Sequence, residues 1–145
     1  MAVAPREAAK YLCKRSGWEL TNLSLQKILY ISHMWHLGRH GSQLVLGPFE
    51  AWDYGPVSPS VYQTVRAFGS EPIANVFRGF RDVDASAEAR TMDEVYDIVG
   101  GWSPSQLVAF THRPGGAWDQ VYDPARRHNV IPNSAILDEF RRFHG

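Results

Sequence analysis

Four histidines are the residues of this sequence whose chemistry suits metal binding or acid–base catalysis. His33, His36 and His40 follow one another at helical spacing, which places them on one side of a helix, and His112 lies much later in the chain. Imidazole is a good ligand for zinc, nickel or iron. The spacing differs from the HExxH pattern of zinc enzymes, and no glutamate accompanies it. We interpret the four as structural or surface residues and keep a small metal-dependent hydrolase as an alternative.

Other catalytic patterns are missing from the sequence. Cys13 is the single cysteine, so the chain has no disulfide framework, and its helical Tyr-Leu-Cys-Lys context is typical of a small buried residue. The sequence contains no GxSxG, P-loop, GxGxxG or CxxC motif. Its glycine-rich turn at 113–116 lacks the Lys-Ser/Thr pair that would follow in a phosphate-binding loop. We therefore predict a protein that is not an enzyme and uses no cofactor.

Composition narrows the possible partners. The 145 residues carry a formal net charge of zero, which argues against binding nucleic acid by broad phosphate neutralisation. The helices expected after Ser58 and Ser103 carry few basic side chains, so a DNA-binding regulator is a second alternative rather than the prediction. No run of 18 apolar residues and no signal-peptide pattern occur, which predicts a cytoplasmic protein without a membrane partner.

An acidic segment is the one local departure from the even balance of acidic and basic residues. Six acids lie between Asp82 and Asp97, against the single basic Arg90. The segment is either a solvated helix face or a docking patch for a basic partner.

Proline, glycine and capping residues mark the elements that would position all these side chains. Pro5, Ser58-Pro59 and Ser103-Pro104 are typical first-turn signals, and Thr91 with Glu94 forms a possible capping box. Weak periodicity indicates a flexible insertion over residues 71–89. The expected helices span residues 5–16, 23–37, 59–69, 91–100, 104–112, 117–122 and 133–143.

The second helix is the expected centre of the fold. Its apolar stripe is so wide that the helix must be covered on most sides, and the stripe consists of Leu25, Ile28, Leu29, Ile31 and Trp35. Residues 44–46 and 49–52, bounded by Gly-Pro pairs, predict a small hairpin. The fold class is thus mainly α: one compact domain, residues 1–145, of six or seven helices around a central apolar helix, with a short β-like excursion near residues 43–54.

A set of short blocks extends over most of the chain: LSLQKILY at 23–30, WHL at 35–37, FEAW at 49–52, YGPV at 54–57, VY at 61–62, DEV at 93–95, Leu107, TH at 111–112 and Trp118. Together these blocks resemble the Panacea domain family, the SocA-like and phage GepA-like proteins. Ala117 departs from the proline that the family has before this tryptophan. We predict chiefly structural roles for the motif residues Gln26, Lys27, Tyr30, Trp35, His36, Gly55, Pro56, Tyr62, Thr111, His112 and Trp118.

The resemblance implies a mainly helical antitoxin. Such domains are encoded beside diverse toxins, and the resemblance implies neutralisation of a cognate protein toxin by direct contact. It also implies that the antitoxin can act as an adaptor that delivers the toxin to the ClpXP protease.

A partner would be held by the irregular segment that the two Gly-Pro pairs enclose. Phe49, Trp52, Asp53 and Tyr54 combine large aromatic rings with a charge, which is typical of interface anchors. An extended segment can also accept a strand from a partner at its edge. The other interpretation is that the segment only packs across the long helix.

Overall fold

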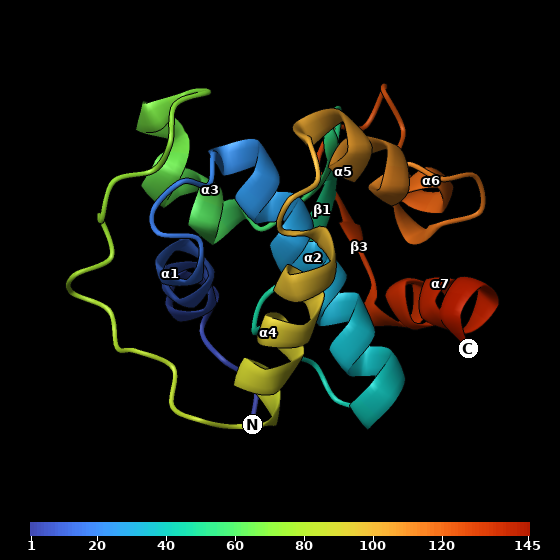
Figure 1. Cartoon of the computed structure of the whole chain (residues 1–145). Helices are drawn as coiled ribbons and strands as arrows, with labels where there is room; N and C mark the ends of the chain where they lie inside the picture. Colours follow the sequence, from blue (N-terminus) through green and yellow to red (C-terminus); the bar gives the residue numbers. More distant parts are fainter.

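Helix α2 (Asn22–His40) runs through the middle of the molecule, and every other element lies around it in this computed structural model of residues 1–145 (Figure 1). The remaining helices are α1 (Pro5–Arg15), α3 (Pro59–Val65), α4 (Ala87–Val99), α5 (Pro104–Thr111), α6 (Ala117–Val121) and α7 (Asn133–His144). The short 3-10 helix η1 (Arg66–Phe68) extends α3, and three strands complete the fold: β1 (Phe49–Trp52), β2 (Gly55–Val57) and β3 (Asn129–Ile131). The predicted mainly-α fold of six or seven helices around a central apolar one is confirmed, and the number of α-helices is seven.

Local signals set the ends of α2. The Thr21 side chain accepts a hydrogen bond from the Ser24 amide at the first turn, and Gly41 ends the helix in the left-handed conformation (φ 69°). Thirteen of its 19 residues are buried, so the helix is covered on most of its circumference. None of the seven helices combines the length and hydrophobicity that crossing a bilayer requires.

Trp35 is the exception to the predicted burial of α2. Its ring is half-buried and packs edge-on against Phe140, at 5.2 Å between ring centroids, while the Arg39 guanidinium lies 5.5 Å from its centroid. Trp35 also lines a small apolar depression between α4 and α7. The prediction that it is a core residue was wrong, because the neighbouring helices leave this side of α2 partly open.

Gly38 lies inside α2, one residue beyond the predicted end of this helix at residue 37. A methyl group on its Cα would overlap the ring of Phe140 in α7. We expect Gly38→Ala to lower the free energy of unfolding by about 1–3 kcal/mol, as overpacking does, despite the better helix propensity of alanine. Denaturant titration measures the change. Gly79→Ala, where a methyl group meets no neighbouring atom, is the control; equal stability of the two variants would contradict the close packing.

The small sheet joins a local hairpin to a third strand that lies far along the chain. Its strand order is β2-β1-β3, and both pairings are antiparallel. The predicted hairpin between 44–46 and 49–52 was wrong: β1 pairs with β2 across a two-residue turn, and Val45 instead forms one parallel bridge with Val3. Because β1 is the central strand, neither of its edges is free to accept a strand from a partner.

Helix α4 begins earlier than predicted. Ser86, not Thr91, is its N-cap and accepts a hydrogen bond from the Ala89 amide. Thr91 is buried inside the helix, where its hydroxyl lies 2.8 Å from His36 Nδ1. The predicted capping box at Ser103 and Gln106 is confirmed at the start of α5.

The segment that precedes α4 has no regular structure, but it is attached to the core. Ile73 and Phe77 are buried, and they hold residues 71–86 along the outside of α1 (Figure 1). Ion pairs add to this attachment, since Lys10 and Lys14 both lie within 3.4 Å of Asp82.

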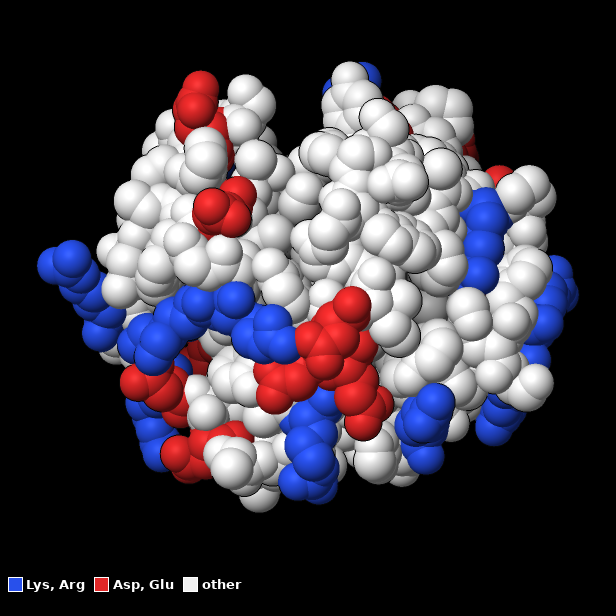
Figure 2. Space-filling view, viewed as in Figure 1, with Lys and Arg blue, Asp and Glu red and all other residues white.

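The acids between Asp82 and Asp97 are largely engaged within the molecule. Besides the Asp82 pairs, Arg15 of α1 pairs with both Asp93 and Asp97 of α4. Figure 2 shows both signs of charge intermingled over this region, whereas the upper right of the same face is mostly uncharged. The acidic segment therefore serves first to join α4 to α1, which leaves few acids free for a basic partner.

Candidate partner-binding site

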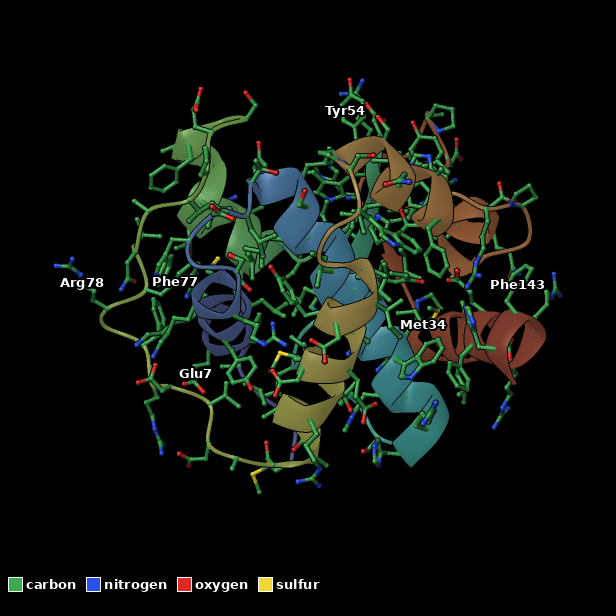
Figure 3. All side chains as sticks on the ribbon, viewed as in Figure 1. Glu7, Met34, Tyr54, Phe77, Arg78 and Phe143 are labelled. Atoms are coloured by element: carbon green, nitrogen blue, oxygen red, sulfur yellow. The ribbon has the colours of Figure 1, made fainter.

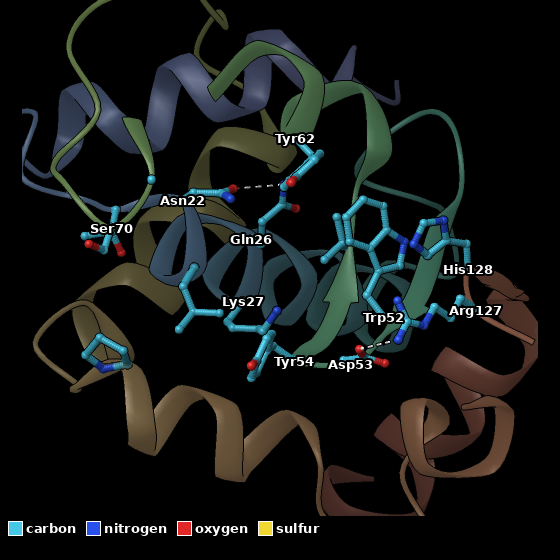
Figure 4. Close-up of a pocket in the computed structure, with 15 residues that line it drawn as sticks. Asn22, Gln26, Lys27, Trp52, Asp53, Tyr54, Tyr62, Ser70, Arg127 and His128 are labelled. Atoms are coloured by element: carbon cyan, nitrogen blue, oxygen red, sulfur yellow. Dashed lines mark hydrogen bonds and ion pairs between the residues drawn. The ribbon is translucent and has the colours of Figure 1, made fainter. Parts of the chain in front are cut away.

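A cavity of about 670 Å³ opens beside the turn between β1 and β2 (Figure 4). The start of α2 forms its floor, and residues of α3, of the segment after η1 and of the loop before β3 form its walls. Its volume lies within the range of about 300–1,000 Å³ that is usual for ligand sites. Six residues that the sequence analysis singled out line it: Gln26, Lys27, Trp52, Asp53, Tyr54 and Tyr62.

The turn residues stand at the mouth of this cavity. Tyr54 is 73% exposed, and Figure 3 shows it at the top edge of the molecule, pointing outward. Asp53 accepts a hydrogen bond from the Tyr122 hydroxyl at 2.6 Å and lies 3.8 Å from the Arg127 guanidinium. Phe49 is only 2% exposed and packs against Tyr30 and His33, so its prediction as a partner contact was wrong.

Trp52 forms an aromatic wall. Its ring stacks on His128, at 4.1 Å between centroids, and meets Tyr62 edge-on at 4.7 Å. The indole N–H donates to Glu50 Oε1 at 2.9 Å, which fixes the ring orientation. The wall therefore offers a large, rigid apolar surface whose polar atom is already satisfied.

Three stacked rings support the turn from below. His112 stacks on Trp118 at 3.6 Å, and Trp118 stacks on Tyr122 at 4.5 Å. The Trp118 indole N–H donates to the carbonyl of Trp52 at 2.7 Å, and Tyr122 holds Asp53. Trp118 of α6 and Tyr122, which follows that helix, thus fix the position of a turn that lies 66 and 69 residues away from them in the sequence.

Gln26 and Lys27 connect α2 to the other end of the turn. Gln26 Oε1 accepts from the Ser58 amide at 2.8 Å and its Nε2 donates to the Ser58 carbonyl at 3.3 Å. Lys27 is wholly buried and donates to the carbonyl of Pro56 at 3.1 Å. Burial lowers the pKa of Lys27 to about 7, because the charged form loses its hydration.

Gly55 is required where it stands for two reasons. Its φ of 114° is unfavourable for other residues, and a methyl group there would come within 2.8 Å of Lys27 Cε and 3.2 Å of His112 Nε2. Pro56 follows on β2, an outer strand of the sheet, where the missing amide does not interrupt a ladder between two strands.

The other motif residues lie outside the cavity. Tyr30 donates to Glu139 at 2.7 Å, and the Thr111 hydroxyl donates back to the Leu107 carbonyl at 3.1 Å within α5. These contacts, like those of Gln26 and Trp118, are structural. Trp35, the half-buried residue described above, also lies on a different face.

The four histidines that suggested a metal site do not come together. His33 is held between the Val45 amide and Asn133, while His36 contacts Thr91 and lies 3.4 Å from Glu88. His40 packs against His36 with the two rings tilted by 32°, and His112 belongs to the support of the β1–β2 turn. No three His, Cys, Asp or Glu side chains are arranged to hold a metal ion.

Sequence reasoning missed Arg127 and His128, which complete the cavity wall. They lie in an irregular segment that carries no pattern, and their approach to Trp52 and Asp53 depends on β3 pairing with β1. The burial of Lys27 was missed as well, although its place within a helix that is apolar on most sides was the available signal.

Comparison with known proteins agrees with these motifs. The family model described as "Antitoxin SocA-like, Panacea domain" matches residues 25–119, which include the residues of α2, β1, β2, α5 and α6 described above. The chain is 38% identical over 136 residues to Antitoxin SocA of Caulobacter vibrioides (strain NA1000 / CB15N), a match that covers 84% of this chain and 72% of that protein. No solved structure matches. The chain therefore belongs to the SocA-like family of Panacea-domain antitoxins.

Proposed function

We propose that this chain is a binding protein rather than an enzyme, and that it neutralises a cognate protein toxin by direct contact in the cytoplasm. Trp52, Asp53 and Tyr54, together with the cavity beside them, form the proposed contact surface. The observation that carries this proposal is the exposure of Tyr54 on a turn held in place by the stacked rings of His112, Trp118 and Tyr122. Family membership supports the antitoxin role.

The physical argument is one of preorganisation. An exposed aromatic side chain on a rigid support loses little conformational entropy when a partner covers it, so more of the contact energy appears as affinity. The alternative interpretation, that this segment only packs across α2, explains why Phe49 and Pro56 are buried. It does not explain why Tyr54 is exposed. Strand addition at the β2 edge is the less suitable mode, because β2 has three buried residues and lacks the Pro56 amide.

Tyr54→Ala and Asp53→Lys should each weaken toxin binding by about 30-fold or more, the effect of losing an interface residue worth about 2 kcal/mol. Growth rescue on co-expression with the product of the neighbouring toxin gene should be lost in parallel. The melting temperature should change little after Tyr54→Ala, since the side chain is exposed. Ile98→Ala, at a residue that is 61% exposed on α4, is the control and should retain rescue.

The cells that co-express the chain and its toxin also show whether the toxin is inhibited by binding or degraded. If binding alone neutralises the toxin, its level stays constant with and without active ClpXP; if the chain is an adaptor, the toxin accumulates when ClpXP is inactive. Full rescue by both turn variants would show that the toxin is held elsewhere, and the acids Asp84 and Glu94 would be tested next.

A further inference from the structure

We propose that the floor of the cavity is a carboxylate subsite, in which an Asp or Glu side chain of the toxin pairs with Lys27 Nζ. The proposal rests on the proposed function, because it takes the toxin as the partner that covers this surface. It goes further in naming the chemical group that the partner inserts and the residue that recognises it.

Lys27 is a buried cation without a counter-charge. It is wholly buried, it lines the cavity, and it makes no ion pair, although several other basic side chains of the chain do. Its hydrogen bond to Pro56 occupies one of the three donors that an ammonium group carries. A buried charge of this kind opposes folding, and a methionine of similar length would fill the same space without that penalty. A residue that lowers stability in this way is expected where it serves binding rather than folding.

A second unsatisfied group lies beside it. His112 Nε2 is the one buried side-chain nitrogen or oxygen that has no hydrogen-bond partner. It approaches the same point beside Gly55 as Lys27 Nζ, since a methyl group there would lie 3.1 Å from Nζ and 3.2 Å from Nε2. The positive charge of Lys27 also lowers the pKa of His112, after the larger effect of burial. Pro56 thus accepts one of the Lys27 donors, and a carboxylate in the cavity would accept another.

The other charged groups around the cavity are already compensated. Asp53 is held by Tyr122 and faces Arg127, so this acid and this base balance each other at the mouth (Figure 4). His112 after α5, His128 from the loop before β3, and the tyrosines Tyr54 and Tyr62 are the remaining titratable neighbours. Figure 4 shows the Lys27 side chain pointing toward Tyr54, the residue that we place in the toxin contact.

The dimensions favour a protein side chain over a free anion. A carboxylate group fills only a small part of about 670 Å³, whereas a short segment that carries an acid beside apolar residues also covers the Trp52 and Tyr62 rings. The partner chemistry that fits is therefore an acidic residue with apolar neighbours.

Binding of a carboxylate has a measurable consequence for protons. In the free protein burial keeps the pKa of Lys27 near 7, while a paired carboxylate favours the ammonium form and raises it. The complex therefore takes up a proton as it forms, and affinity falls as the pH rises above 7. The fall approaches tenfold per pH unit between the free and bound pKa values.

The test is titration calorimetry of the full chain with its purified toxin at pH 7, 8 and 9, in two buffers of different ionisation enthalpy. We expect the wild type to take up close to one proton at pH 8 and 9, and to weaken about tenfold between pH 8 and pH 9. Lys27→Met should bind at least tenfold more weakly at pH 7 and should lose the proton uptake. Lys14→Met, which removes an exposed lysine of α1, should behave as the wild type. If Lys27→Met does not fold, Lys27→Gln replaces it in the same titrations.

Replacing each Asp and Glu of the toxin by its amide identifies the inserted group. One such variant should bind the wild-type chain weakly and should add no further loss to Lys27→Met. Unchanged affinity and proton uptake in Lys27→Met would overturn the subsite while leaving the proposed function intact, provided that Tyr54→Ala still weakens binding. Absence of any binding by the wild type would overturn both. Glutamate or acetate that shifts the Lys27 NMR signals, with toxin binding unaffected by Lys27→Met, would assign the subsite to a free anion and overturn the toxin contact.

Discussion

Replacing Glu139 by alanine should lower the free energy of unfolding by about 3–5 kcal/mol, because it leaves a largely buried cation without its partner. The Glu139 side chain is 0% exposed, and it accepts hydrogen bonds from Tyr30 Oη at 2.7 Å, Arg113 Nε at 3.0 Å and the Ala117 amide at 3.2 Å. These donors belong to α2, to the turn after α5 and to α6. One carboxylate of α7 therefore joins three other parts of the fold.

Loss of this carboxylate leaves each donor unsatisfied. The Arg113 side chain is only 18% exposed and lies between the rings of Phe110 and Phe143, so it cannot turn fully to water. Burial and the neighbouring Glu139 charge raise the pKa of Tyr30 well above its usual value, so the phenol stays protonated and remains a donor. Ala117 supplies an amide donor at the position where the family pattern has proline, which strengthens this junction in the present chain.

Urea titration at pH 7 measures the effect. Asp138→Ala removes the adjacent acid of α7, which is exposed and unpaired, and should change stability by less than about 0.5 kcal/mol. A loss below about 1 kcal/mol for Glu139→Ala would show that the junction contributes little.

Lys27→Met should act in the opposite direction and stabilise the chain by about 1–4 kcal/mol at pH 7 or below, the range found when buried charges are replaced by apolar residues. Its pKa falls from 10.5 to about 7 on folding. Below pH 7 the lysine is protonated in both states, so the folded state carries the full penalty of a buried charge. Between pH 7 and 10.5 the unfolded state binds more protons, so the stability of the wild type rises with pH.

The advantage of Lys27→Met should therefore be largest at pH 6, decrease through pH 8 and 9, and disappear above pH 10.5. Urea titrations of both proteins across this pH range give the difference. Lys14→Met, at an exposed lysine, should show no such dependence. A variant less stable than the wild type at pH 6 would mean that the hydrogen bond to Pro56 outweighs the charge penalty. A more stable variant that no longer binds its toxin would show that Lys27 is retained for recognition.

Helices were predictable from the sequence because their signals are local. Pro5, Gly41 and the Ser103–Gln106 box act on backbone groups within one turn, so their effect does not depend on the rest of the fold. The start of α4 was misplaced because Thr91 was taken as the cap, whereas Ser86, five residues earlier and also able to cap a helix, is the N-cap. The choice between them depended on tertiary contacts, since Thr91 is needed inside the helix beside His36.

The sheet was not predictable in the same way. The partner of β1 on one side is β3, about eighty residues later, and no short-range signal indicates such a pairing. The residue types along β1 also leave open which of its faces is buried. Successive side chains of a strand point to opposite faces, but this alternation does not indicate which face packs against the core. Tertiary packing decided that Phe49 lies inside and that Trp52 lines the cavity.

The sequence by itself thus determined the helices, the central place of α2 and the resemblance to an antitoxin family, because these depend on residue type and spacing along the chain. The tertiary structure alone decided that motif residues from α2 and the β1–β2 turn meet around one cavity, and that His112 and Trp118 support this turn. It also decided that Lys27 is buried there without a counter-charge and that Tyr54 remains exposed. Burial and pairing depend on which distant surfaces come together, and that is a property of the packed chain rather than of any segment of it.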